Sequence, residues 1–335
     1  MYVEVIKNIK ESKELLRLKE IKKMQNDFDG NEKKMERKAV VVIGCIAAFL
    51  ILIIARLTNE VSFPLMLSCF GQSSVQWMPF SYTQKRHRRA HYGYLNVKNQ
   101  EPLQLECDLC AIISNSGQMT EQKVGSEIDQ ASCIWRMNNA PTKGYEEDVG
   151  KSTTVRVVSH TSVPLLLKNA DYFFKETNST IYVIWGPFRN MRKDGSGIVY
   201  NMLKKTVDSY PGAKIYVTTE KRMSYCDEIF KKETGKDRIQ SGSYLSTGWF
   251  TLILAMDACY RIQVYGMIND TYCKSEGFRK VPYHYYEPGR SECDEYVLHE
   301  NAPYGGHRFI TEKKVFAEWA KKHTITFTHP NWTLS

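Results

Sequence analysis

Short β-rich runs alternate with helical patterns from about residue 105 to the end of the chain, and this alternation limits the possible folds. Runs rich in β-branched and aromatic residues predict strands at residues 110–114, 134–137, 155–159, 181–185, 214–218, 262–265 and 325–328. Helical spacing predicts helices at residues 163–168, 198–207, 223–230, 248–259 and 310–322. The pattern is typical of an α/β protein with a mostly parallel sheet covered by helices. Ligands of such sheets bind outside the carboxyl ends of the strands.

An uninterrupted apolar run at residues 39–55 predicts a membrane anchor near the N-terminus. Its 17 residues reach the short end of the range that spans a bilayer. Arg37 and Lys38 precede the run, and the positive-inside tendency then places the N-terminus in the cytosol. A cleaved signal peptide is the competing interpretation, although no A-x-A site follows the run.

Two features indicate that the rest of the chain faces an oxidising lumen. Asn178, Asn269 and Asn331 each begin an N-x-S/T triplet, which accepts a glycan only on the lumenal side. Nine cysteines are present, and several should pair in that compartment. The expected organisation is a cytosolic tail, a transmembrane signal-anchor, a lumenal stem and a single catalytic domain, at residues 1–38, 39–57, 58–100 and 101–335.

The formal charge of +9 suits an anionic partner but does not identify it. No nucleic-acid-binding motif is present, and the basic residues are spread along the chain, so nucleic acid is not expected. An acidic lipid and a phosphate-bearing substrate remain open.

Polar residues follow two neighbouring predicted strands. Asn115-Ser116-Gly117 ends the first of them, and Asn138 ends the next. An asparagine at such a turn can hydrogen-bond a phosphate or a ribose, although an ordinary strand-to-loop turn explains both positions equally well. The nearby Cys107-x-x-Cys110 pair could bind zinc, form a redox site or enter disulfides. A second close Cys/His pair is missing, which favours disulfides.

Two further clusters carry groups that suit catalysis. Ser246, Thr247 and Gly248 begin an apolar helix, where free amides can bind an anion or a hydroxyl can simply cap the helix. His284 lies near Glu287, and His307 lies near Glu312. Each histidine could exchange a proton near neutral pH, or could be structural.

Together these segments resemble the four sialylmotifs of the animal sialyltransferases. The segment from Cys110 to about Gly150 resembles the large motif, and residues 246–266 resemble the small motif. Residues 284–287 resemble the third motif, and His307 with Glu312 resembles the very small motif, His-x4-Glu. The segments RMNNAPTKGYEEDVG, ETGKDR, YLSTGWF, VPYHYYE and HRFITEKKVF are similar to the N-acetylgalactosaminide α-2,6-sialyltransferases within that family.

The resemblance implies a modified Rossmann-like fold of the GT-A type and an inverting transfer from CMP-sialic acid that needs no metal and no cofactor. His307 would be the general base, His284 would stabilise the departing phosphate, and Glu312 could orient His307. The implied substrate-binding residues are Asn115, Asn138, Ser246, Thr247, Gly248 and Tyr285. The implied disulfide joins Cys110 to Cys259.

The same resemblance implies an acceptor and a location. Sialic acid would be added to the 6-hydroxyl of GalNAc in sialyl-α-2,3-galactosyl-β-1,3-GalNAc, on gangliosides or O-glycans. The protein would be a single-pass type II protein of the Golgi membrane, with its catalytic domain in the lumen. The alternatives are a sialyltransferase of another linkage or acceptor, and a non-catalytic Golgi protein that binds glycans. His284, His307 and Glu312 argue against the second alternative.

Overall fold

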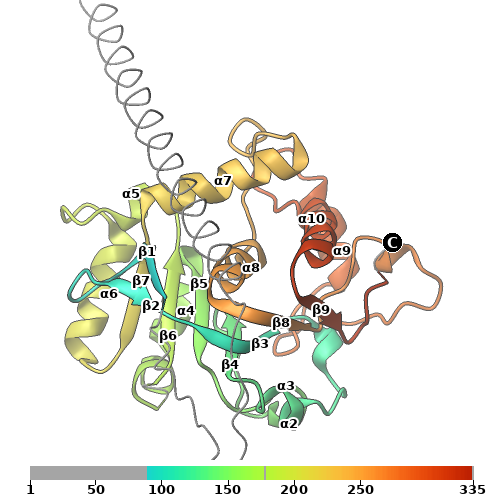
Figure 1. Cartoon of the computed structure of the whole chain (residues 1–335), viewed down its shortest axis with the longest axis horizontal. Helices are drawn as coiled ribbons and strands as arrows, with labels where there is room; N and C mark the ends of the chain where they lie inside the picture. Colours follow the sequence, from blue (N-terminus) through green and yellow to red (C-terminus); the bar gives the residue numbers. More distant parts are fainter. Residues whose placement is uncertain (1–88, 177–178, 334–335) are drawn as a thin grey trace, which may run out of the picture. The chain divides into compact units, whose positions relative to one another are not determined.

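The core of the structure is one sheet in which seven neighbouring strands run parallel. The computed structural model describes residues 89–176 and 179–333. Within them, nine strands lie in the order β2-β1-β7-β6-β5-β4-β3-β8-β9, and β1 is antiparallel to both of its neighbours (Figure 1). The strand bounds are β1 Ala90–Asn96, β2 Pro102–Gln104, β3 Cys107–Ile113, β4 Cys133–Met137, β5 Val155–Ser159, β6 Ile181–Trp185, β7 Lys214–Thr218, β8 Cys259–Tyr265 and β9 Ile325–Thr328. The expected fold class is confirmed.

Helices cover both faces of this sheet. Their bounds are α2 Gly125–Ile128, α3 Glu146–Val149, α4 Val163–Lys168, α5 Phe188–Met191, α6 Ile198–Ser209, α7 Glu220–Thr234, α8 Thr247–Ala258, α9 Glu292–Glu300 and α10 Phe309–Lys322. Side chains of α7, α8 and α10 share a core with Val155 and Val157 of β5. Side chains of α4 and α6 share another core with Val158. Because successive strand residues point to opposite faces, these two cores lie on opposite sides of the sheet.

The sequence of α8 explains its central position. The helix is apolar on nearly every side, and a helix of that kind has to be buried. Trp249 packs against Phe230 of α7 and against Trp319 of α10, so α8 is covered by the other two helices of its layer. Its first residues are thereby held at a fixed place beside the sheet.

All seven strands predicted from the sequence are present, but β1 and β2 are additional. β1 lies within residues 58–100, the segment expected to be stem, so the sheet begins before residue 101. Only His91 and Tyr94 of β1 are buried, and β2 has three residues. Neither strand therefore shows a clear period-2 pattern.

The strand order creates a crevice beside β3. From β3 the chain adds β4, β5, β6 and β7 successively on one side, whereas β8 and β9 lie on the other side. The order thus reverses between β3 and β8. Ligands of open parallel sheets bind outside the carboxyl ends of the strands at such a reversal.

Three disulfides connect the described residues. Cys107 is bonded to Cys133, Cys110 to Cys259 and Cys273 to Cys293. The second of these is the bridge that the family resemblance implies, and it joins β3 to β8. Both members of the Cys107-x-x-Cys110 pair are bonded to other cysteines, so this pair offers no thiol for zinc or for a redox reaction.

Part of the expected organisation lies outside the described residues. The predicted anchor at residues 39–57 and the triplet at Asn178 are among these positions. No helix of the described part of the chain is long and apolar enough to cross a membrane. Of the other two triplets, Asn331 is exposed, and Asn269 is partly buried with its side-chain oxygen accepting hydrogen bonds from Thr271.

Removing the Cys110–Cys259 bridge by substituting alanine for both cysteines is expected to reduce stability strongly. The bridge spans 149 residues, whereas the Cys273–Cys293 bridge spans 20. In the chain-entropy model these loops correspond to roughly 5 and 3 kcal/mol respectively. Urea unfolding of the two double-alanine variants should therefore show the larger loss for Cys110–Cys259. Equal losses, or the reverse order, would contradict the prediction.

Candidate active site

A cavity of about 120 Å³ lies at the carboxyl ends of β3 and β4. The turn after each strand, the start of α8, the loop before α9 and the start of α10 form its wall. Eight of the nine catalytic and substrate-binding residues predicted from the sequence line it: Asn115, Asn138, Ser246, Thr247, Gly248, His284, His307 and Glu312. Segments that lie far apart in the sequence therefore meet at the crevice that the strand order creates.

The two asparagines present different polar atoms to this cavity. Asn115 is buried, and its side-chain oxygen has no hydrogen-bond partner among the described residues. Asn138 has a left-handed backbone with φ of 50°, and its side-chain oxygen accepts a hydrogen bond from the Ser159 amide at 3.0 Å. The same oxygen accepts a longer hydrogen bond from the Thr247 hydroxyl at 3.5 Å, so the amide nitrogen of Asn138 is the group that remains as a donor. A buried acceptor without a partner is unusual in a native structure and suits a ligand that donates a hydrogen bond.

A buried carboxylate ties α10 to the start of α8. One oxygen of Glu312 accepts a hydrogen bond from the Ser246 amide at 2.8 Å, and the other accepts one from the Ser246 hydroxyl. The same hydroxyl accepts a hydrogen bond from the Trp249 amide and so caps α8. Burial raises the pKa of Glu312 to about 7, although the hydrogen bonds from Ser246 oppose that shift.

His307 is held as one defined tautomer. Its Nδ1 lies 3.0 Å from the carbonyl oxygen of Tyr244. A carbonyl can only accept, so Nδ1 carries the proton and Nε2 is left as an unprotonated base. Burial lowers the pKa of His307, and His299 and Arg308 act in the same direction, whereas the backbone hydrogen bonds to Tyr244 and Leu245 oppose the shift. The imidazole is therefore neutral near pH 7.

This arrangement corrects the expected role of Glu312. The carboxylate was expected to orient His307 from the second ring nitrogen, but it contacts Ser246 instead. The Tyr244 carbonyl takes the orienting position. Both His307 and Glu312 line the cavity, and Glu312 in addition holds the start of α8 through Ser246.

His284 is fixed between two aromatic rings. Its ring stacks on Tyr283 at a centroid distance of 4.4 Å and on Tyr286 at 5.1 Å. Its Nδ1 contacts the Glu287 carboxylate. The side chain can thus present its second nitrogen to the cavity without losing much rotamer entropy on binding.

Tyr285 is the predicted substrate-binding residue that does not line this cavity. Its ring is buried, and its hydroxyl donates a hydrogen bond to the Pro141 carbonyl at 2.5 Å. Its amide donates to the Asn115 carbonyl at 2.8 Å. Tyr285 therefore fastens the loop that carries His284 to the turn that carries Asn115.

Two buried charged residues near the cavity are not predicted from the sequence motifs. Lys313 lines the cavity, and Glu292 lies behind it in α9. Both side chains are almost completely buried. The helical period contains a signal for Lys313, because it stands three residues before the buried Phe316 and so shares a face with it.

Replacing Glu312 with glutamine is expected to remove a pH-dependent loss of stability. Burial raises the pKa of Glu312 from 4.5 to about 7, so within this window the folded protein holds a proton that the unfolded chain has released. Rising pH favours the state with fewer bound protons, which here is the unfolded one. Urea titrations should therefore show the free energy of unfolding of the wild type falling relative to Glu312→Gln across this window. Parallel pH profiles would contradict the assignment.

Comparisons with known proteins agree with the motif resemblance. Residues 72–324 match the model of the family described as Glycosyltransferase family 29 (sialyltransferase). The human "Alpha-N-acetylgalactosaminide alpha-2,6-sialyltransferase 3" is 79% identical over 301 residues, which cover 90% of this chain and 99% of that protein. The mouse "Alpha-N-acetyl-neuraminyl-2,3-beta-galactosyl-1,3-N-acetyl-galactosaminide alpha-2,6-sialyltransferase" is 54% identical over 242 residues, 72% of this chain and 67% of that protein.

Solved structures show a more distant similarity. One, described as "Crystal Structure of a Mammalian Sialyltransferase in complex with Gal-beta-1-3GalNAc-ortho-nitrophenol", aligns with a TM-score of 0.43 and 22% identity, over 66% of this chain and 69% of that one. The motif details point to subtype III of the α-2,6 group, and the name of the human relative agrees. From the family match and from this identity, the chain belongs to glycosyltransferase family 29, the sialyltransferases.

Proposed function

We propose that the protein transfers sialic acid from CMP-sialic acid to the 6-hydroxyl of GalNAc in sialyl-α-2,3-galactosyl-β-1,3-GalNAc acceptors, on gangliosides or O-glycans. The observation that carries the proposal is the convergence of His307, His284 and the start of α8 on one cavity. The linkage and the acceptor come from the names of the relatives at 79% and 54% identity.

The donor nucleotide would occupy the wall formed by the two strand ends. The unpartnered oxygen of Asn115 would accept a hydrogen bond from an amino or hydroxyl group of CMP. Asn138 would donate from its amide nitrogen, and Thr247 with Gly248 would bring the positive end of α8 near the phosphate. Ser246 contributes by holding that helix end, because its hydroxyl is engaged by Glu312 and Trp249.

The transfer itself would need one base and one cation. Nε2 of His307 would take the proton of the acceptor hydroxyl as its oxygen bonds to the anomeric carbon of sialic acid. The bond from that carbon to the phosphate oxygen breaks on the opposite face, so the configuration inverts. His284 and the start of α8 would stabilise the charge on the departing CMP. These groups can supply the positive charge for the phosphate, so we propose that neither a metal nor a cofactor takes part.

We further propose the topology of a single-pass type II protein of the Golgi membrane, anchored at residues 39–57. The three disulfides support a lumenal location for the catalytic domain, because such bonds persist in oxidising compartments.

A linkage analysis of the products with a panel of acceptors tests the proposed reaction. Purified lumenal protein, CMP-sialic acid and acceptors with or without the α-2,3-linked sialic acid should give an α-2,6 product on GalNAc only when that sialic acid is present. Turnover should be retained in EDTA. Another linkage would identify a sialyltransferase of different specificity, and donor binding without any transfer or hydrolysis would identify a glycan-binding protein. Loss of turnover in EDTA with recovery in Mn²⁺ would refute the metal-independent mechanism.

Replacing His307 with alanine is expected to lower kcat by about 100- to 10,000-fold, the usual contribution of a general base. The affinity for CMP should change little, because the histidine acts on the acceptor. His323 is exposed directly after α10, the helix that follows His307, and His323→Ala is a matched control that should retain normal turnover. Steady-state kinetics with CMP titrations measures both quantities. Near-normal kcat in His307→Ala would show that the base lies elsewhere.

A further inference from the structure

A second and larger cavity adjoins the candidate active site along the carboxyl ends of β5 and β6. Its volume is about 600 Å³, which lies within the range of small-molecule sites, whereas the first cavity has about 120 Å³. Asn138, Thr247 and His307 line both cavities, so the proposed general base stands where the two meet. A ligand of the larger cavity would therefore lie beside His307.

The turn after β6 brings an aromatic ring and an arginine to this cavity. Phe188 and Arg189 begin α5, line the cavity and are both exposed. The turn passes close to the end of β5, since a Cβ at Gly186 would lie 2.6 Å from the Cβ of His160. Aromatic rings offer a large apolar area on binding, and the C–H face of a sugar can pack against such a ring.

The guanidinium group of Arg189 is free to bind a ligand. Within residues 89–176 and 179–333, nothing forms a hydrogen bond or an ion pair with it. Burial lowers the pKa of His160, and the charge of Arg189 acts in the same direction, so this charge is felt inside the cavity. A guanidinium carries five N–H donors in a planar fork that matches the two oxygens of a carboxylate.

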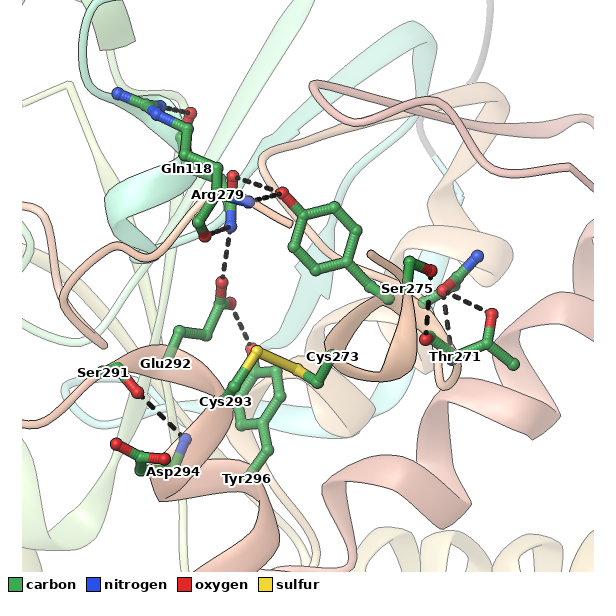
Figure 2. The surroundings of a disulfide bond; sticks show 12 residues. Gln118, Thr271, Cys273, Ser275, Arg279, Ser291, Glu292, Cys293, Asp294 and Tyr296 are labelled. Carbon is green, nitrogen blue, oxygen red and sulfur yellow. Dashed lines mark hydrogen bonds between the residues drawn. A yellow bond between two sulfur atoms is a disulfide. The ribbon is translucent and has the colours of Figure 1, made fainter. Parts of the chain in front are cut away.

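Other arginines near the active site are engaged by the protein. Arg238 lines the same cavity, but it donates two hydrogen bonds to the Asp227 carboxylate, at 2.5 and 2.6 Å. Arg308 donates to two backbone carbonyls. Figure 2 shows Arg279 beside a disulfide, where it donates a hydrogen bond to the Gln118 carbonyl at 3.2 Å. Of the two arginines that line the larger cavity in the described part of the chain, the one in α5 is therefore available.

The carboxylates of the larger cavity leave the charge of Arg189 in place. Asp227 is occupied by Arg238. Glu220 stands in the first turn of α7, where the positive end of the helix favours a carboxylate, and it forms no ion pair with Arg189 among the described residues. An anionic ligand would thus find an unpaired cation at this wall.

We propose that Arg189 binds the carboxylate of the sialic acid that the acceptor already carries, and so selects sialylated acceptors. The inference rests on the proposed function and adds a specificity-determining residue to it. With the 6-hydroxyl of GalNAc at Nε2 of His307, the galactose and the sialic acid would lie along the ends of β5 and β6, toward Phe188 and Arg189. The sialic acid is the one anionic sugar of that acceptor, so a bidentate arginine contact would distinguish it from an acceptor that ends in galactose.

Kinetics with three acceptors tests this contact: the sialylated trisaccharide, its carboxyl methyl ester, and the disaccharide without sialic acid. Arg189→Met should lower kcat/KM for the trisaccharide about 10- to 100-fold, chiefly through KM, the range for a hydrogen bond to a charged group. Esterification should lower kcat/KM of the wild type by a similar factor and that of Arg189→Met very little, because the variant has already lost the interaction. The affinity of the variant for CMP should be unchanged, since Arg189 does not line the smaller cavity.

Arg192 offers a matched control. It is exposed three residues further on, pairs with Asp194 and does not line the larger cavity. Arg192→Met should therefore keep the wild-type constants for all three acceptors. Arg189→Lys should recover only part of the loss, because an ammonium keeps the charge but lacks the planar fork.

The outcomes separate this contact from the proposed reaction. A wild type that uses the disaccharide as well as the trisaccharide would overturn the proposed acceptor and this inference with it. If the wild type requires the sialylated acceptor and Arg189→Met remains as sensitive to the methyl ester, the proposed function stands and the contact is wrong. Equal losses on all three acceptors would show that Arg189 supports the fold or the reacting GalNAc, and would likewise overturn its assignment to the carboxylate.

Discussion

The hydrogen bonds between Glu312 and Ser246 hold together the two helix starts on which the site depends. Both partners are buried, and both oxygens of the carboxylate are used. The position of α8 is fixed by its apolar surface, so this contact transfers that fixed position to the start of α10 and hence to His307. The cost is the burial of a carboxyl group, seen in the pKa of Glu312 raised to about 7. Truncating Glu312 would leave the amide of Ser246 buried without its acceptor.

Backbone hydrogen bonds hold the part of the cavity wall that is formed by the end of β3 and the loop that carries His284. Gly117 donates a hydrogen bond to the Pro282 carbonyl at 3.0 Å, and Tyr285 donates one to the Asn115 carbonyl. A Cβ at Gly117 would lie 2.7 Å from that carbonyl oxygen, so only glycine allows this approach. These two contacts fasten the loop that carries His284 to the end of β3. Asn115 and His284 are therefore held in one rigid unit.

The parallel strands could be predicted because each is a short run of β-branched and aromatic residues, and the carboxyl ends of β3 and β4 then indicated Asn115 and Asn138. The family motifs also indicated His307 and His284, and both line the cavity. The hydrogen-bond partner of each of these side chains could not be predicted in this way. The sequence predicts a contact between Glu312 and His307, but the carboxylate of Glu312 accepts hydrogen bonds from Ser246. The sequence also predicts that Tyr285 binds the substrate, but its hydroxyl donates a hydrogen bond to the Pro141 carbonyl. A motif shows which side chains meet and does not show which atoms are already engaged.

The choice of a backbone carbonyl to orient the base has a chemical consequence. The cavity would have to hold the phosphate and the carboxylate of the donor beside His307. A carboxylate behind the imidazole would add negative charge at that point and would favour the protonated ring, which cannot act as a base. The Tyr244 carbonyl fixes the same tautomer without a full charge, and burial keeps the pKa of His307 low. Glu312 can then serve the structure instead, by holding the start of α8 through Ser246.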